Sequence, residues 1–176
     1  MKMKMNAQVA IVMGSKSDLP NLKKTFELLG DFGVPYTARV ISAHRTPVEA
    51  GRFASEAEKN GIKVIICAAG MAAHLAGVIA SYTTLPVIGI PVACEPFNGL
   101  DALLAMVQMP PGIPVATVTS GKSGADNAAL LAVSILALSD PPLSGKLKDF
   151  RKRQTEKVMA ADAELQETLK AGSIPI

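Results

Sequence analysis

The sequence of 176 residues has few of the residue types on which several classes of protein depend. It contains no tryptophan and only 4% aromatic residues, and its net charge is +3, so a nucleic-acid-binding surface with stacking side chains is not expected. The sequence has no run of about 18 uncharged apolar residues, so no membrane span is expected. The opening Met-Lys-Met-Lys-Met is too short for a signal peptide, and lysines interrupt its apolar residues. We therefore expect a cytoplasmic protein with neither nucleic acid nor membrane as a partner.

Cysteine and histidine are also scarce, with two of each. Cys67 and Cys94 lie in separate apolar segments, which is typical of reduced core residues rather than of a disulfide pair or of metal ligands. The two histidines have no cysteine or carboxylate at ligand spacing, so no metal site is expected. The motifs G-x-G-x-x-G and G-x-S-x-G are absent, which argues against a nicotinamide cofactor and a hydrolase nucleophile. Ser120-Gly-Lys-Ser123 resembles the end of a nucleotide-binding loop, but Ala116 stands where that loop requires its first glycine.

Apolar residues, by contrast, are abundant: 49% of the chain is hydrophobic and 19% is charged. This length is sufficient for one domain with a full core, and the low charge content indicates further burial between subunits. Five apolar segments alternate with helical patterns, which predicts five βα units, a parallel sheet of order 2-1-3-4-5 and helices on both faces. The predicted strands are 9–13, 36–41, 63–69, 86–91 and 115–118, and the predicted helices after the first one are 47–59, 78–82, 99–108, 127–138 and 144–169.

The helix that begins at Pro47 has Thr46 as its expected N-cap. Its apolar positions, Val48, Phe53, Ala54 and Ala57, are expected to face the core.

The loop after the first strand, Gly14-Ser-Lys-Ser-Asp18, leads directly into a helix. The N-terminus of a helix offers free N–H groups and a partial positive charge, which suits an anion such as phosphate. Short hydroxyl side chains at this position have two interpretations: they cap the helix, or they bind a ligand.

The loops after the first three strands meet at one edge of the predicted sheet, and both histidines of the chain lie in them. Arg45 can bind phosphate through two parallel hydrogen bonds, and the hydroxyls of Ser15, Ser17 and Ser42 can complete the site. Asp18 would repel phosphate, so it is expected to accept from sugar hydroxyls. An arginine, three serine hydroxyls and an aspartate together indicate a ribose phosphate as the ligand.

His44, next to Arg45, is the expected proton carrier, because imidazole titrates near neutral pH. A purely structural histidine is the alternative for both His44 and His74.

Several motifs occur in the same order in one family. They are Met13-Gly-Ser-Lys-Ser-Asp18, Ser42-Ala-His-Arg-Thr-Pro47, Ala72-Ala-His-Leu75, Val107-Gln-Met-Pro110, Gly112-Ile-Pro114 and Asn127-Ala-Ala-Leu-Leu-Ala132. The chain resembles the N5-carboxyaminoimidazole ribonucleotide mutases of purine biosynthesis from Val9 to about Val158. These enzymes move a carboxylate from the exocyclic nitrogen of an aminoimidazole ribonucleotide to ring carbon four.

The resemblance implies a flavodoxin-like three-layer fold, a homo-octamer and a reaction without a cofactor. It implies a catalytic domain over residues 6–142 and a C-terminal helix, 143–170, that packs on a neighbouring subunit. It also implies a functional link to the ATP-dependent synthetase that makes the carbamate. The implied roles are phosphate binding by Ser15, Ser17, Ser42 and Arg45, ribose binding by Asp18, general acid–base catalysis by His44, and further substrate contacts by Gly70, Ala72 and His74.

The chain departs from the family pattern at Met71, which replaces a glycine, at Ala76, which replaces a proline, and over Cys94–Asn98. Met71 either crowds the substrate ring or covers it.

Two alternatives to the mutase are a carboxylase that uses free carbon dioxide and a nucleotide-binding relative with another function. The carboxylase branch tends to carry His-Lys where this chain has His44-Arg45, and a serine in the third loop where this chain has Ala72-Ala-His74. Both features favour the mutase.

Overall fold

In the computed structural model, residues 7–172 are described, and they divide into two compact units. The first unit ends at Leu136 and the second begins at Ala137.

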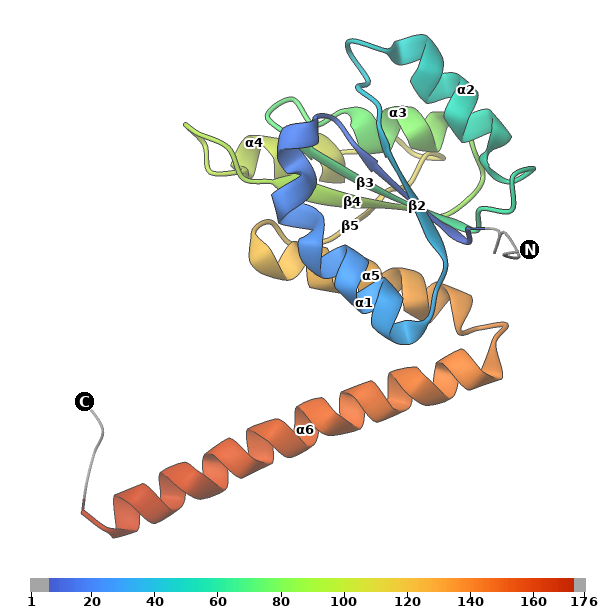
Figure 1. The fold of residues 1–176 in the computed structure, drawn as a ribbon. Helices are drawn as coiled ribbons and strands as arrows, with labels where there is room; N and C mark the ends of the chain where they lie inside the picture. The colour runs from blue at the N-terminus through green and yellow to red at the C-terminus, as the bar shows by residue number, and fades with distance from the viewer. Residues whose placement is uncertain (1–6, 173–176) are drawn as a thin grey trace. The chain divides into compact units, whose positions relative to one another are not determined.

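The first unit is built around a five-stranded sheet of order β2-β1-β3-β4-β5 in which every neighbouring pair is parallel. The predicted strand order is therefore confirmed. The strands are β1 Val9–Met13, β2 Tyr36–Val40, β3 Val64–Gly70, β4 Val87–Val92 and β5 Ala116–Thr117. The helices are η1 Lys16–Leu22 (a 3₁₀ helix), α1 Lys23–Phe32, α2 Pro47–Ala57, α3 Leu75–Ser81, α4 Leu100–Val107 and α5 Lys122–Leu136. Helices α2, α3 and α4 cover one face of the sheet, and α1 and α5 cover the other (Figure 1).

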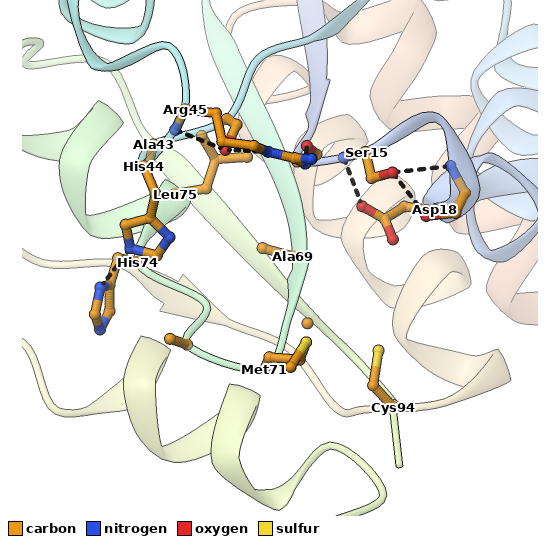
Figure 2. A pocket seen from close by; sticks show the side chains of 15 residues that line it. Ser15, Asp18, Ala43, His44, Arg45, Ala69, Met71, His74, Leu75 and Cys94 are labelled. Atoms are coloured by element: carbon orange, nitrogen blue, oxygen red, sulfur yellow. Dashed lines mark hydrogen bonds between the residues drawn. The ribbon is translucent and has the colours of Figure 1, made fainter.

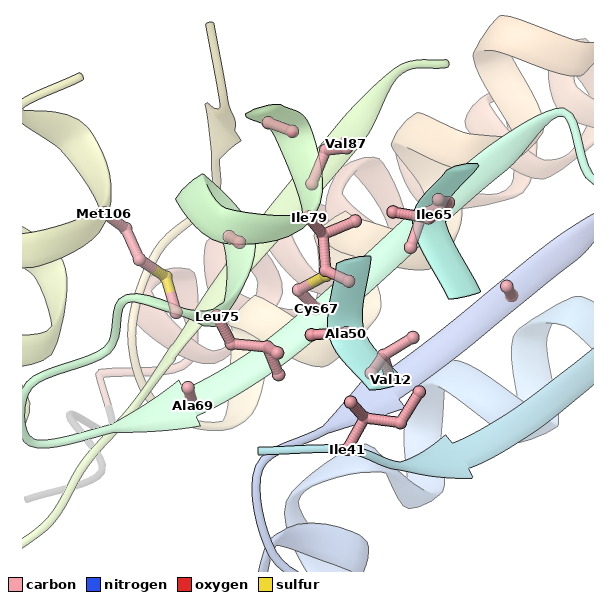
Figure 3. Packing of buried hydrophobic residues seen from close by; sticks show 14 of the residues in the cluster. Val12, Ile41, Ala50, Ile65, Cys67, Ala69, Leu75, Ile79, Val87 and Met106 are labelled. Atoms are coloured by element: carbon pink, nitrogen blue, oxygen red, sulfur yellow. The ribbon is translucent and has the colours of Figure 1, made fainter. Parts of the chain in front are cut away.

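The three central strands read as continuous apolar runs because helices cover both of their sides. The core between the sheet and α2–α4 contains Val12, Ile65, Cys67 and Leu75 among its buried residues (Figure 3). Cys67 is fully buried, as predicted, and this burial raises the pKa of its thiol well above the ordinary value. The thiol therefore stays neutral and serves as a small apolar side chain.

The first helical segment differs from the continuous helix expected. It begins as η1, and the α-helix starts only at Lys23. Pro20 lies inside η1 and has no N–H to donate to a carbonyl four residues back, which disfavours a regular α-helix there. Gly33 ends α1 with φ 74°, and its N–H donates to the carbonyl of Gly30.

Helix α2 begins at Pro47 with Thr46 as its N-cap residue, as predicted, although Thr46 makes no side-chain capping bond. The prediction that Val48 faces the core is wrong, since Val48 is 85% exposed. Ala54 and Ala57 are buried as predicted, and Ala50 and Gly51 complete the buried face. At Gly51 a Cβ would lie 3.2 Å from the ring of Tyr82, so the contact to α3 depends on the missing side chain.

The second unit contains α6, Pro141–Lys170, which begins three residues before the predicted start. Asp140 caps it by accepting from the N–H of Leu143, and Pro141 occupies the first helical position, where its missing N–H costs nothing. The side chains of Val158, Met159 and Leu165 are exposed along this helix. Among the helices that the structure describes, none is long and apolar enough to cross a membrane.

Candidate active site

A cavity of about 450 Å³ lies at the carboxyl ends of β1, β2 and β3 (Figure 2). This is the edge at which the topology of the sheet predicts a ligand site. Every residue predicted to contact the substrate lies in the lining of this cavity, and six other residues lie there as well. The predicted ones are Ser15, Ser17, Asp18, Ser42, His44, Arg45, Gly70, Ala72 and His74, and the others are Gly14, Ala43, Ala69, Met71, Leu75 and Cys94.

The loop after β1 forms a reciprocal cap on η1. The Oγ of Ser15 accepts from the N–H of Ser17 at 3.3 Å, and a carboxylate oxygen of Asp18 accepts from the N–H of Ser15 at 3.0 Å. The hydroxyl of Ser17 also donates to the Oγ of Ser15 at 2.7 Å. The capping interpretation is therefore confirmed. Because the same side chains line the cavity, the ligand-binding interpretation remains compatible with this arrangement.

Asp18, at the end of this loop, is half-buried. Desolvation raises the pKa of its carboxyl above the ordinary value, and the hydrogen bond from Ser15 and the positive charge of Arg45 oppose that rise. Desolvation has the largest effect of the three, so the carboxylate is less stable here than in water.

The loop after β2 folds around Ser42. Its Oγ accepts from the backbone N–H of Arg45 at 3.2 Å and from Nε of the same residue at 3.4 Å. Thr46 donates from Oγ1 to the carbonyl of Ser42 and accepts from its N–H, which explains why this hydroxyl does not cap α2. The turn places the side chains of His44 and Arg45 in the same cavity.

His44 and His74 are in direct contact across the cavity edge. Nε2 of His44 lies 2.9 Å from Nδ1 of His74, and the two rings are nearly perpendicular at 85° with centroids 5.0 Å apart. The topology predicts that both residues lie at this edge, but not that they form a hydrogen-bonded pair.

The end of β3 and the loop after it line the cavity with the small residues Gly70 and Ala72 and with Met71. Gly70 has no room for a side chain, because a Cβ there would lie 2.6 Å from Sγ of Cys94. Met71 has φ 57°, in the left-handed region, and is 61% exposed. This is the position where the family pattern has glycine, and a non-glycine residue costs about 1–2 kcal/mol in that conformation.

Cys94 lines the cavity, a position that the sequence did not predict. It is half-buried, whereas we expected it in the core. Cys94 follows the end of β4 by two residues, so the same rule that located the other loops would have located it.

Within residues 7–172, no three histidine, cysteine or acidic side chains gather closely enough to hold a metal ion. The groups in the cavity that can bind or transfer protons are hydroxyls, one carboxylate, one guanidinium, one thiol and two imidazoles. They suit a phosphorylated sugar together with proton transfer.

The sequence model described as AIR carboxylase matches residues 8–157. The chain belongs to this family. The resemblance based on the motifs is thereby confirmed, and the match to the AIR carboxylase family contains every residue of the cavity.

Three proteins illustrate the similarity. The chain is 51% identical over 155 residues to the N5-carboxyaminoimidazole ribonucleotide mutase of Pseudomonas aeruginosa, covering 88% of this chain and 95% of that protein. It is 56% identical over 144 residues to the mutase of the same name from Pyrococcus abyssi, covering 82% of each. The crystal structure of Treponema denticola PurE matches with a TM-score of 0.81 at 31% identity, covering 89% of this chain and 97% of that one.

Proposed function

We propose that this chain is an N5-carboxyaminoimidazole ribonucleotide mutase. It moves a carboxylate from the exocyclic nitrogen of the substrate to carbon four of the imidazole ring. The observation that carries the proposal is about 50% identity to proteins of that name over most of both chains, combined with a cavity that gathers the groups this reaction needs.

The substrate binds with its 5′-phosphate against the first two loops. Arg45 and the hydroxyls of Ser15, Ser17 and Ser42 supply donors for the phosphate oxygens, and Asp18 accepts from the ribose hydroxyls. This assignment is supported by the position of these side chains around one cavity.

His44 transfers one proton in two steps. It first protonates the carbamate nitrogen, the bond between that nitrogen and the carboxyl carbon breaks, and the nitrogen retains the electron pair while carbon dioxide is released. The electron-rich ring carbon then attacks the carbon dioxide, and His44 removes the proton from that carbon. The proton returns to His44, so the reaction consumes no co-reactant.

Carbon dioxide must remain beside the ring between these two steps. Ala69, Met71 and Ala72 line the cavity with apolar groups, which limits the water around the reacting atoms. Holding the two fragments together replaces a bimolecular encounter, an effect that contributes several kcal/mol to lowering the barrier, roughly 7–11 at its upper limit.

A carboxylase that takes free carbon dioxide is the second candidate, because the matching family model is described as AIR carboxylase. The pair His44-Arg45 and the segment Ala72-Ala-His74 resemble the mutase branch instead. The test is to supply the carbamate substrate to the purified protein without bicarbonate, ATP or metal. The mutase forms the C4 carboxylate under these conditions. Product that appears only from aminoimidazole ribonucleotide and bicarbonate identifies a carboxylase, and nucleotide binding without product identifies a non-catalytic relative.

Assembly as a homo-octamer is part of the proposal. It is supported by an apolar stripe on α4, where Leu100, Leu104 and Val107 are 57%, 50% and 55% exposed at one-turn spacing. We assign residues 6–142 to the catalytic domain and 143–170 to a helix that packs on a neighbouring subunit, an arrangement supported by the exposed apolar residues of α6. We also propose that the protein is cytoplasmic and that an ATP-dependent synthetase supplies its labile carbamate.

A further inference from the structure

The contact between His44 and His74 restricts where their protons lie. A neutral imidazole carries hydrogen on one of its two nitrogens, and the 2.9 Å separation between Nε2 of His44 and Nδ1 of His74 places one hydrogen between them. Either His44 donates to His74 or the reverse, and the two cases differ in what remains on the other nitrogen of His44.

That other nitrogen, Nδ1 of His44, lies on the side of the ring turned toward the cavity (Figure 2). If His74 donated, a neutral His44 would carry its own hydrogen on Nδ1, and its only basic nitrogen would already be occupied by His74. It would then have no nitrogen free to remove a proton from the ring carbon. If His44 donates, its Nδ1 is bare in the neutral form and protonated in the imidazolium form, as the two steps of the reaction require.

We propose that His74 is a positioning residue: its Nδ1 accepts from Nε2–H of His44 and thereby fixes the tautomer in which Nδ1 of His44 exchanges the proton with the substrate. This inference rests on the proposed function, because the need for a bare Nδ1 on neutral His44 comes from the two proton-transfer steps of the reaction. The same hydrogen bond serves both protonation states, because Nε2–H is present in each. His74 is the N-cap residue of α3 but makes no side-chain capping bond, so its ring is not required to begin that helix.

The first test is nitrogen-15 NMR of histidine-labelled protein without ligand, at a pH above the usual imidazole range. The chain has only two histidines, so two rings give the whole spectrum, and His44→Asn assigns them. We expect a hydrogen-bearing Nε2 and a bare Nδ1 on His44. A hydrogen on Nδ1 of His44 would overturn the proposal, and this result does not depend on which reaction the protein catalyses.

The second test compares His74→Leu with His74→Asn, in which the amide oxygen replaces Nδ1 as acceptor. For His74→Leu we expect kcat to fall at least about tenfold, short of the roughly 10²–10⁴-fold contribution of a general acid–base residue, with KM within about twofold of wild type. His74→Asn should recover most of kcat. A rise in KM as the main effect would make His74 a substrate contact, and equal losses in both variants would also contradict the proposal. A wild-type protein that does not convert the carbamate would refute the proposed function while leaving the NMR result to decide the tautomer.

Discussion

Arg45 donates from Nη2 to the backbone carbonyl of Gly14 at 3.0 Å, and this bond joins the loop after β2 to the loop after β1. The two loops come from neighbouring strands, so the guanidinium spans the part of the cavity in which the serine hydroxyls lie. The arrangement positions a permanent positive charge beside Ser15 and Asp18 before substrate arrives.

Replacing this charge tests the phosphate site. For Arg45→Gln we expect KM for the carbamate to rise roughly 10–100-fold, because a hydrogen bond to a charged group contributes about 1.5–3 kcal/mol. The matched control is Arg52→Gln on α2, where the arginine pairs with Glu49 and Glu56 outside the cavity. KM within about twofold of wild type for Arg45→Gln would remove Arg45 from the phosphate site.

Two substitutions at Ser15 separate capping from binding. Ser15→Ala removes the N-cap of η1 and should cost about 1 kcal/mol, a fall of roughly 2–4 °C in the thermal midpoint, whereas Ser15→Gly costs only a few tenths of a kcal/mol. Both lack the hydroxyl, so both should raise KM by a similar factor, about tenfold. Melting curves and steady-state kinetics on the same preparations measure the two effects. A KM that changes only in proportion to the lost stability would leave capping as the sole role of Ser15.

Asp18 gives a pH dependence of known sign. Desolvation holds the pKa of its carboxyl above the ordinary value of 3.8, so the folded state binds this proton more tightly than the unfolded state does. Stability from this group is therefore present below pH 3.8 and is lost as the pH rises through the raised pKa. Compared with Asp18→Asn at fixed protein concentration, the thermal midpoint of wild type should fall over that window and then stay level. A relative midpoint that rises with pH would show that the hydrogen bond from Ser15 and the charge of Arg45 outweigh desolvation.

The apolar stripe on α4 predicts how assembly responds to charge. Leu104→Glu combined with Val107→Glu should yield smaller species in light scattering after size exclusion, because burying a carboxylate in an apolar interface is costly. Val48→Glu, at an 85% exposed position on α2, is the control. An unchanged molar mass for the double variant would place the subunit contacts elsewhere.

Much of the first unit follows from the sequence because burial on both faces makes a parallel strand an unbroken apolar run. The boundaries of β1, β3 and β4 lie within one residue of the predicted ones for this reason. The site follows from the same topology, since the loops after β1, β2 and β3 must open at one edge. The polar residue types in those loops then indicate a sugar phosphate.

What the sequence does not predict depends on local geometry. Helix α5 begins five residues before its apolar pattern, where Gly124 packs against the carbonyl of Thr119 with no room for a side chain. The exposed Val48 shows that an apolar residue in the first turn need not lie on the buried face. The pairing of His44 with His74 depends on the shape of two loops, which neither spacing nor composition specifies.

The central claim is that carbon dioxide passes from nitrogen to ring carbon inside the cavity while His44 carries the proton. The most direct measurement supplies carbamate with carbon-13 in its carboxyl group, in excess unlabelled bicarbonate, and follows the label in the product by mass spectrometry. We predict that wild type retains most of the label at C4, and that His44→Asn binds the nucleotide but forms no product. Product that contains mainly unlabelled carbon, or near-normal turnover by His44→Asn, would contradict the account.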